Sequence, residues 1–413
     1  MPIIVLPSEG LKGIESSPET NRRYYADLTA SRLSQLERVR ARLAEELRLP
    51  PAVVARPDAI HLLPGAGCLI FDDRVVDARR LKALAWVEVV IPVPLLPVVT
   101  GPLSTLQQQP QPWHLSRVSK PRNLNGTGNV IGVVDSGYDP VKFPELTFTA
   151  VSAIYGTPGK VPTAPAPAGD QDPTNLHGSG VCAFLAGSTS GMAPGANLAV
   201  AVVPPPGSAM SNSAALYYCI DWLLTHSTSP PRWGQTAPSG CDVINLSQAS
   251  TAPGMYSTGL DTPLNAARAY NTLVVASIGN SGSAVNQWQC PGAHKSVLAV
   301  GAVDQNDIVD GSAWGIANGV KRPDLVAPGV ALEQPAAVGP PTVLRTGTSF
   351  AAPLVAGAAA LVMQKDPSCR HNVVALTAKL KTLVRPAVGT TTALAGSPLS
   401  DAAGAGVLDL STL

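Results

Sequence analysis

The residues of this chain best suited to chemistry surround a serine in front of a strongly apolar helix. The heptapeptide Gly347-Thr348-Ser349-Phe350-Ala351-Ala352-Pro353 is followed by the sequence LVAGAAALV at residues 354–362. A proline is tolerated early in a helix, which indicates that the helix begins near Ser349. Backbone N–H groups at a helix N-terminus are unpaired donors, and one of them could hold an oxyanion beside the hydroxyl. Ser349 is therefore a candidate nucleophile, and the alternative is an ordinary buried helix with a Ser or Thr cap.

A candidate acid and a candidate base precede this serine. The apolar run VIGVV at residues 130–134 ends in Asp135, as in a strand buried on both faces, and ligands bind at the carboxyl ends of such strands. His177 directly precedes a second helix rich in small residues. An imidazole within roughly 2.6 to 3.2 Å of a serine can take its proton, and a buried carboxylate can hold that imidazole in one tautomer. We therefore predict a triad of Asp135, His177 and Ser349; a solvated turn aspartate and a capping or core histidine are the alternatives.

The chain order Asp135, His177, Ser349 resembles that of the subtilisin-like serine peptidases, the subtilases. Further segments agree with this family in order, namely residues 242–247, 274–282, 290–292, 297–302 and 323–329. The resemblance runs from Trp113 to about Asp409. It implies a three-layer α/β/α fold with a mainly parallel sheet. The strands expected in this sheet lie at residues 130–134, 198–203, 243–247, 273–277 and 297–303.

The resemblance implies a serine endopeptidase that hydrolyses internal peptide bonds through an acyl-enzyme on Ser349. Asn280, in the sequence SIGNSG, is then the side chain that donates to the oxyanion together with the backbone N–H of Ser349. Two other functions stay open at this point. A ligase or macrocyclase of the same fold would pass the acyl group to an amine, and a non-catalytic regulatory protein would keep only the fold.

The family also places a polypeptide substrate between edge segments, one of which includes Ser247, Gln248 and Ala249. The first specificity pocket would be lined by segments that include Ile278, Gly279 and Gly292. These segments carry no acidic side chain, which favours a small or apolar substrate residue. Gln248-Ala249-Ser250 departs from the glycine-rich version often seen in the family, and the added Cβ atoms would narrow the cleft. A restricted processing role follows as a hypothesis.

The first hundred residues differ from the rest of the chain. Residues 21–49 carry leucines at helical spacing, and an apparent β-α-β unit follows, extended at 59–71, helical at 77–85 and extended at 87–91. This small α+β domain at residues 1–100 resembles the inhibitory propeptide of subtilases. Its removal from a zymogen would cut the polar linker at residues 101–112, ahead of a catalytic domain at 113–413. A permanently attached regulatory or docking domain is the alternative.

Composition limits the partners and the location of the protein. The 413 residues include only 14% charged residues and a net charge of +1, which gives nucleic acid or an anionic membrane no electrostatic attraction. The six cysteines form no C-x-x-C pair, which indicates reduced thiols and argues against zinc, although a bridge such as Cys219 with Cys241 stays open.

The proline-rich segment 156–175 is expected to be a solvated loop. We expect no metal, no cofactor, no membrane span and a cytoplasmic location, because the first residues lack the basic stretch of a signal peptide.

Overall fold

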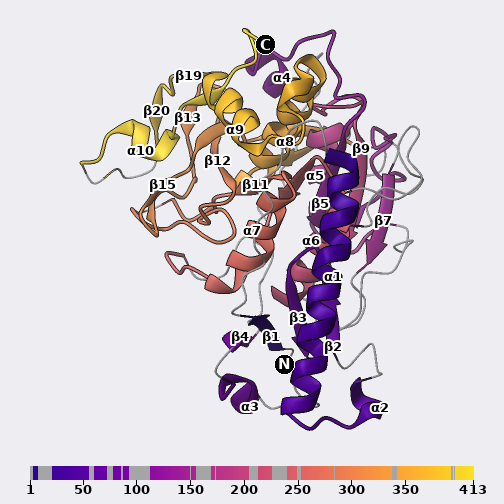
Figure 1. Ribbon diagram of the computed structural model, residues 1–413. Helices are drawn as coiled ribbons and strands as arrows, with labels where there is room; N and C mark the ends of the chain where they lie inside the picture. Colours follow the sequence, from indigo (N-terminus) through magenta and orange to yellow (C-terminus); the bar gives the residue numbers. More distant parts are fainter. Residues whose placement is uncertain are drawn as a thin grey trace.

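The chain folds into a large sheet flanked by helices and a smaller N-terminal sheet covered by one long helix (Figure 1). The computed structural model describes residues 3–7, 21–54, 60–71, 78–84, 87–92, 112–148, 150–154, 169–172, 174–203, 213–225, 240–248, 253–282, 284–336, 342–391, 394 and 396–413. Structural statements below concern these residues.

The central sheet is almost entirely parallel. Its strands follow the order β19-β21-β16-β12-β11-β10-β5-β9-β7, and only β19, at one edge of this order, runs antiparallel to its neighbour. Their bounds are β5 Val130–Asp135, β7 Ala150–Ile154, β9 Asn197–Val202, β10 Val243–Leu246, β11 Leu273–Ser277, β12 Leu298–Val303, β16 Leu325–Pro328, β19 Val384–Arg385 and β21 Val407–Leu408. The predicted strands therefore match observed ones to within one residue at each end.

Alternation along the strands divides the side chains between two cores. In β5, Ile131 and Val133 pack into the core that includes helices α5 (His177–Ala186), α8 (Thr348–Lys365) and α9 (Val373–Thr382). Val130 and Val134 of the same strand pack into the core that includes α6 (Ser213–Thr225) and α7 (Asp261–Ala269). Successive residues of a strand point to opposite faces, so this division places helices on both sides of the sheet. The predicted three-layer α/β/α fold is confirmed.

Shorter elements complete the large domain. They are α4 Trp113–Arg117, α10 Leu399–Ala403, β13 Ile308–Val309 with β20 Gly389–Thr390, and the pairs β6 Gly137–Tyr138 with β8 Gly169–Asp170, β14 Gly315–Ala317 with β15 Val320–Arg322, and β17 Leu332–Pro335 with β18 Thr342–Arg345. Two of these pairs, β6 with β8 and β17 with β18, support the site described below.

The N-terminal part is an antiparallel sheet in the order β2-β3-β1-β4. Its elements are β1 Ile3–Pro7, α1 Asn21–Glu46, α2 Pro51–Val54, β2 Ile60–Leu63, β3 Cys68–Phe71, α3 Ala78–Lys82 and β4 Val87–Pro92. The predicted extended stretch at 59–71 is wrong, because a turn through Pro64 and Gly67 (φ 71°) splits it into the β2–β3 hairpin. The predicted β-α-β order is present as β3, α3 and β4, and both strands run antiparallel to β1, which lies between them, so the unit is split by this strand.

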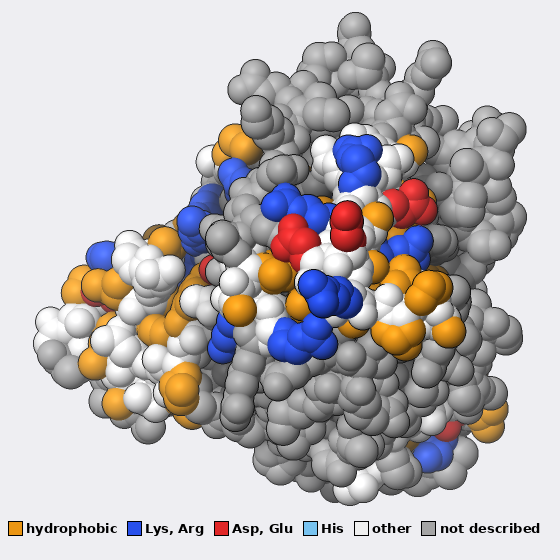
Figure 2. All heavy atoms as spheres, turned by 60° about the horizontal axis from the view of Figure 1, so that its bottom comes forward, with side chains coloured by type: hydrophobic (Ala, Val, Ile, Leu, Met, Phe, Trp, Pro, Cys, Tyr) orange, Lys and Arg blue, Asp and Glu red, His pale blue; other side chains and the backbone are white. Residues whose placement is uncertain are grey.

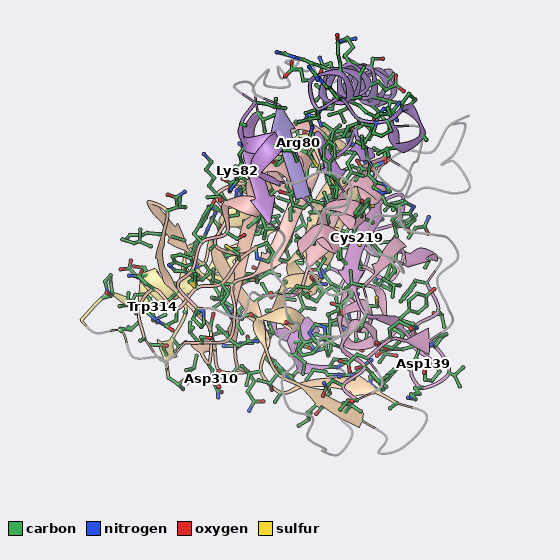
Figure 3. All side chains as sticks on the ribbon, turned by 90° about the horizontal axis from the view of Figure 1, so that it is seen from below. Arg80, Lys82, Asp139, Cys219, Asp310 and Trp314 are labelled. Carbon is green, nitrogen blue, oxygen red and sulfur yellow. The ribbon has the colours of Figure 1, made fainter. Side chains whose placement is uncertain are left out.

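One face of the N-terminal sheet packs on α1 and the other on the large domain. Leu36 and Leu43 of α1, with Leu47 directly after the helix, form a small core with strand residues such as Phe71. The opposite face of the hairpin contributes Leu63, Ala66, Cys68 and Ile70 to the core around α6. Figure 3 views the molecule from this end, with Arg80 and Lys82 of α3 and Cys219 of α6 labelled. On the face shown in Figure 2, acidic and basic side chains of the described residues are intermixed.

Polar contacts also join the two parts. The guanidinium of Arg32 on α1 lies 5.1 Å from the ring centre of Tyr270 in the large domain, and within the N-terminal part it donates to the carbonyl of Gly65 at 3.1 Å. The Asp221 carboxylate on α6 accepts the backbone N–H of Ala66 at 3.0 Å. Thr29 and Tyr270 share a hydrogen bond of 2.9 Å between their hydroxyls. A hydrophobic face and several hydrogen bonds therefore hold the N-terminal sheet against α6 and α7.

Asp307 ties the start of the large domain to its C-terminal strands. This residue is 2% exposed and accepts hydrogen bonds from Arg117 of α4 and Arg385 of β19, each through Nε and Nη2. Burial alone would raise the pKa of Asp307, but the hydrogen bonds and charges of Arg385 and Arg117 outweigh it and hold this pKa below its usual range. A carboxyl whose pKa is lowered by folding stabilises the fold above its unfolded pKa and loses this contribution as the pH falls.

We predict that Asp307→Asn lowers the free energy of unfolding by roughly 1 to 3 kcal/mol at pH 7, because two arginines lose a charged acceptor. The loss should shrink as the pH falls below about 4, because the unfolded chain then takes up a proton at Asp307 before the folded chain does. Denaturant titration in a Ser349→Ala background, which removes any self-digestion, measures both values. Asp401→Asn is the control, since its partner Lys321 is exposed and the pair is worth less than about 1 kcal/mol. Equal losses for Asp307→Asn at pH 7 and pH 3 would contradict the assignment.

Candidate active site

Asp135 and His177 meet at the carboxyl end of β5. Asp135 is the last residue of that strand and His177 the first of α5, and neither side chain is more than 1% exposed. His177 Nδ1 and Asp135 Oδ1 are 2.9 Å apart. Because the carboxylate can only accept, Nδ1 carries the hydrogen and Nε2 is left as the acceptor in the neutral ring. The same Asp135 oxygen also accepts the backbone N–H of Ser136 at 2.8 Å, which fixes the carboxylate.

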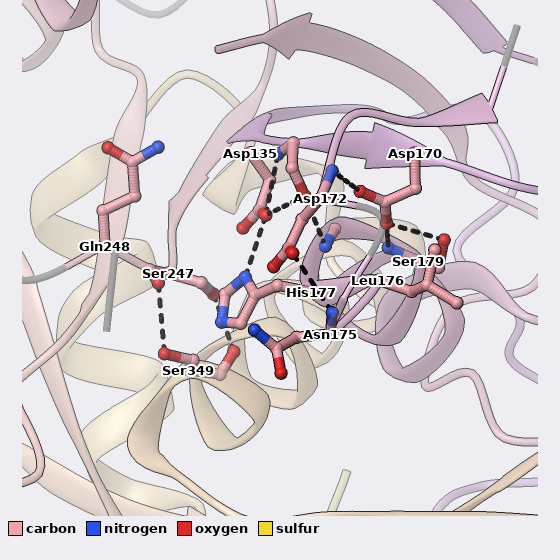
Figure 4. Close-up of polar contacts among 12 residues, drawn as sticks. Asp135, Asp170, Asp172, Asn175, Leu176, His177, Ser179, Ser247, Gln248 and Ser349 are labelled. Atoms are coloured by element: carbon pink, nitrogen blue, oxygen red, sulfur yellow. Dashed lines mark hydrogen bonds and ion pairs between the residues drawn. The ribbon is translucent and has the colours of Figure 1, made fainter. Parts of the chain in front are cut away.

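Ser349 lies in the first turn of α8, directly beside this pair (Figure 4). Its position is set by a reciprocal contact with Ser247, which follows β10. Ser247 Oγ donates to the carbonyl of Ser349 at 2.7 Å, and Ser349 Oγ donates to the carbonyl of Ser247 at 3.1 Å. Asn245 in turn donates to Ser247 Oγ at 2.9 Å. The helix start is therefore anchored to the end of a neighbouring parallel strand.

Figure 4 shows the imidazole of His177 between Asp135 and Ser349. Its ring centre is 5.3 Å from that of Phe350, the residue after Ser349. His177 Nε2 is buried and has no hydrogen-bond partner among the described residues, while Ser349 Oγ is bonded to the Ser247 carbonyl. The three predicted residues are brought together, and the serine hydroxyl donates to the Ser247 carbonyl rather than to the histidine.

Asn280 follows β11 at the same edge of the sheet. Its Oδ1 accepts the backbone N–H and the hydroxyl of Thr348, each at 2.9 Å. Gly347 packs against the Asn280 amide, since a Cβ on Gly347 would lie 3.3 Å from Nδ2, and Gly347 adopts φ 145°. With Oδ1 occupied by donors, the amide group is oriented so that Nδ2 is the atom available to donate. The structure thus places a side-chain N–H donor next to the Ser349 turn.

The predicted pocket segments lie side by side. A Cβ on Gly292 would come within 2.3 Å of the carbonyl oxygen of Ser277, and one on Gly279 within 2.3 Å of Gln289 Oε1. The backbone N–H of Gln289 donates to the carbonyl of Ile278 at 2.9 Å. Ile278, Gly279 and Gly292 therefore belong to one wall, and glycine is required where the two segments touch.

The side chain of Gln248 is buried and does not face an open cleft. It is 8% exposed, and its Nε2 donates to the carbonyl of Val134 at 3.3 Å. Its carbonyl accepts the Ser277 hydroxyl at 3.5 Å. The side chain thus joins β5 to the segment after β10. Ala249 lies outside the described residues, so its predicted role in substrate binding stays a prediction, like that of Ser247 and Gln248.

The segment in front of His177 corrects one expectation. The sequence predicts a solvated loop at residues 156–175, but residues 169–170 form β8, which pairs with β6 and packs on α5. Asp170 accepts the backbone N–H and the hydroxyl of Ser179, each at 2.8 Å, and Asp172 is 6% exposed. Burial raises the pKa of Asp170, and its hydrogen bonds partly offset this. Residues 156–168 and 173 lie outside the described part.

Sequence reasoning missed three residues that support this site. They are Asn245, which orients Ser247, Thr348, which orients Asn280, and Arg345, which donates to the backbone just before His177. Thr348 and Asn245 could have been suspected because they adjoin predicted site residues. Arg345 gave no such signal, since its contacts are made across a chain separation of about 170 residues.

Metal-binding clusters, disulfides and membrane-spanning helices can be looked for among the described residues. No group of three or more His, Cys, Asp or Glu side chains among them is arranged to hold a metal ion. All six cysteines are free and buried, so the Cys219–Cys241 bridge left open by the sequence is not present. None of the helices in the described ranges combines the length and apolar character needed to cross a bilayer.

Two buried histidines show opposite pKa behaviour. Burial lowers the pKa of His177, but the charge of Asp135 and the hydrogen bond to it raise this pKa above the usual value. The Arg345 charge acts in the lowering direction and the Asp170 charge in the raising direction. His114 is equally buried but has no carboxylate partner, and burial lowers its pKa to about 4. The carboxylate is the difference between the two sites.

Comparisons with known proteins point to one family. The model of the Subtilase family (Peptidase_S8) matches residues 126–406, which is more than half of the chain. An alkaline protease of Alkalihalobacillus alcalophilus is 35% identical over 272 residues, 64% of this chain and 62% of that protein. Subtilisin Savinase of Lederbergia lenta is 35% identical over 268 residues, 63% of this chain and 87% of that protein. The chain thus spans 62% of the length of the alkaline protease.

Solved structures show the same fold. A protease from Pseudoalteromonas arctica matches with a TM-score of 0.54 and 24% identity, covering 72% of this chain and 92% of that one. A cold-adapted subtilisin-like serine proteinase matches with a TM-score of 0.53 and 24% identity, covering 69% and 97%. At this identity the two structures support the fold alone.

We predict that Asp135→Asn lowers the pKa of His177, because burial then acts on the imidazole without the opposing negative charge. NMR titration of the histidine ring protons in a Ser349→Ala background measures the shift, and a His177→Gln spectrum assigns the signal. The pKa of His114 is the internal control and should stay near 4. A His177 pKa that is unchanged or higher in Asp135→Asn would show that this carboxylate does not govern the imidazole.

Proposed function

The chain belongs to the subtilase family, and on this premise we propose that it is a serine endopeptidase acting through an acyl-enzyme on Ser349. The observation that carries the proposal is the buried 2.9 Å contact between His177 and Asp135 beside the serine at the start of α8. A carboxylate and an imidazole buried next to a serine hydroxyl are the groups that acyl transfer requires.

The reaction begins when the Ser349 hydroxyl turns from the Ser247 carbonyl toward His177 Nε2, which takes its proton. The Ser349 oxygen then bonds to the carbonyl carbon of the scissile peptide, and the charge of the imidazolium is balanced by Asp135. His177 returns the proton to the leaving amine as the C–N bond breaks. Water, deprotonated by the same imidazole, attacks the acyl-enzyme and releases the acid and the free serine.

The oxyanion of each tetrahedral intermediate would be held by the Asn280 Nδ2 group and the backbone N–H of Ser349. Thr348 supports this role, since its two donors occupy Asn280 Oδ1 and leave the amide hydrogens for the substrate. Donors that are already oriented need no reorganisation when charge develops, which is why they stabilise the transition state strongly.

A polypeptide substrate would lie along the residues after β10 and present one side chain to the wall of Ile278, Gly279 and Gly292. The lack of an acidic group in this wall supports a small or apolar side chain. Restricted processing stays a prediction, since the Gln248 side chain is buried and bonded to the Val134 carbonyl. A ligase would need an amine instead of water to resolve the acyl-enzyme, and no described residue favours that outcome.

We further propose that the N-terminal part inhibits the enzyme within the same chain until the linker at 101–112 is cut. Its support is the packing of the β2–β3 hairpin on α6, together with the contact of Arg32 with Tyr270 and that of Ala66 with Asp221. Of the linker only Pro112 lies within the described residues, so a cleavage site there stays a prediction. The cytoplasmic location stays a prediction as well.

Asn280→Ala should lower kcat on a protein substrate by about 10²- to 10³-fold, the range known for such a donor within this family, and change KM much less. The donor meets the oxygen best in the transition state, so its loss affects turnover more than binding. Initial rates over a range of substrate concentrations measure both constants.

Ser349→Ala is the control for this experiment, since it should abolish turnover altogether. Hydrolysis that persists in Ser349→Ala would overturn the proposed function. A kcat that is unchanged in Asn280→Ala would assign the oxyanion donor to another residue.

Gly65→Val should weaken the attachment of the N-terminal part. A Cβ at residue 65 would lie 2.7 Å from Asp221 Oδ1 and 3.0 Å from Thr225 Cγ2, so the hairpin must move away from α6. After the linker is cut, less N-terminal fragment should co-elute with the large fragment in size exclusion, and peptidase activity should rise. Ala41→Val, on the exposed side of α1, should leave both unchanged. Full co-elution and unchanged activity for Gly65→Val would contradict the inhibitory role of this interface.

A further inference from the structure

Arg345 is a buried cation next to the proposed triad. It is the last residue of β18, four positions before Ser349, and is 3% exposed. Burial lowers the pKa of its guanidinium to about 10, so it stays charged at neutral pH, and the nearby charges of Asp170, Asp172 and Asp135 favour this charge. A buried charge is costly unless it is fully hydrogen bonded, so its contacts indicate what it does.

The guanidinium binds the two residues in front of His177. Its Nη1 donates to the carbonyl of Asn175, and its Nη2 donates to the carbonyl of Leu176 at 3.2 Å. Leu176 adopts φ 49°, a left-handed conformation that a branched side chain rarely adopts. Such a conformation persists only where the surroundings enforce it. Arg345 helps to hold this conformation at Leu176. Leu176 directly precedes α5, whose first residue is His177.

The rest of the guanidinium is also fixed. Its Nε donates to Gln334 Oε1 at 2.8 Å, and Gln334 Nε2 donates to the carbonyl of Ser179 in α5 at 3.3 Å. Gly180 leaves the space that the group occupies, since a Cβ there would lie 3.0 Å from Arg345 Nε and 2.9 Å from the Phe350 ring. The guanidinium carbon is 5.8 Å from the centre of that ring. One side chain therefore joins β17, the start of α5 and the residue after Ser349.

We propose that Arg345 is a positioning residue of this active site, which fixes His177 against Asp135 through the carbonyls of Asn175 and Leu176 and places a positive charge beside the imidazole. This inference rests on the proposed function. The guanidinium holds the serine side and the histidine side of the site together, because the strand that carries it leads directly into the Ser349 turn.

The charge has a consequence for the pH dependence. The charged groups that act on His177 are Asp135 from β5, Asp170 from β8 and Arg345 from β18. The two carboxylates favour the imidazolium and Arg345 disfavours it, so Arg345 keeps the base unprotonated down to a lower pH. Loss of the charge should therefore move the acid limb of the kcat/KM profile to higher pH. A residue that only supports the fold would lower the amount of active enzyme without moving this limb.

The test compares Arg345→Met, Arg345→Lys and the control Arg385→Met in the full-length chain. Arg385 also forms ion pairs but lies on β19 and binds Asp307 and Asp409. Arg345→Met should lower kcat by about 10- to 100-fold, the scale of a displaced catalytic group, and raise the pH of the acid limb. Arg345→Lys should return the acid limb to the pH of the parent but should not restore the full kcat. An ammonium group keeps the charge but lacks the planar fork that binds two carbonyls. Arg385→Met should lower thermal stability and leave both readouts unchanged.

NMR titration of His177 in a Ser349→Ala background gives a second readout that needs no turnover. It should show a higher His177 pKa in the Arg345→Met form, whether or not the parent hydrolyses peptides. An inactive parent with this shift would reject the proposed function and keep the electrostatic role of Arg345. An unshifted limb and an unshifted titration in Arg345→Met would overturn the proposal. If Arg345→Met does not fold, Arg345→Lys decides, with kcat expressed per active site titrated by a fluorophosphonate. A lowered kcat per active site at an unshifted limb supports the proposal, because a loss of active enzyme alone leaves this value unchanged, and a parental kcat per active site overturns it.

Discussion

The buried contact between Asp135 and His177 is the interaction on which the account of this molecule depends. It joins the carboxyl end of β5 to the first residue of α5, with both side chains almost fully excluded from solvent. The parallel sheet makes this contact available, because the residues after β5, β10 and β11 all emerge at one edge. Asp135, Ser247 and Asn280 reach that edge from three different strands, and α8 brings Ser349 to it.

Small residues decide how closely these elements approach. A Cβ on Gly178 would lie 2.2 Å from the carbonyl oxygen of Gly137, so α5 could not begin so close to the turn after Asp135 with any other residue there. Gly180 leaves space for the Arg345 guanidinium in the next turn. The apolar helix that carries Ser349 is buried along nearly its whole length, which keeps the nucleophile in a fixed place. Tight packing of the framework therefore sets the positions on which the chemistry depends.

The sequence predicts the large domain well because buried parallel strands are short, continuous apolar runs. β11, Leu273–Ser277, has the predicted bounds, and the motif around Ser349 gives the start of α8 to within one residue. The N-terminal sheet is harder to predict. β1 pairs with strands more than sixty residues away, and an extended pattern at 59–71 does not distinguish one strand from a hairpin. The roles of Gln248 and Arg345 escape prediction for the same reason, since only the fold brings Val134 and Leu176 to them.

The most direct measurement of the central claim is covalent labelling with a fluorophosphonate, followed by peptide mapping of the adduct. The reagent reacts with a serine whose hydroxyl is activated by a neighbouring base. With the N-terminal fragment removed, the account predicts one adduct, on Ser349, and its loss in His177→Ala and in Asp135→Asn at neutral pH. A native protein that stays unlabelled at Ser349, or is labelled equally well without His177, would contradict it.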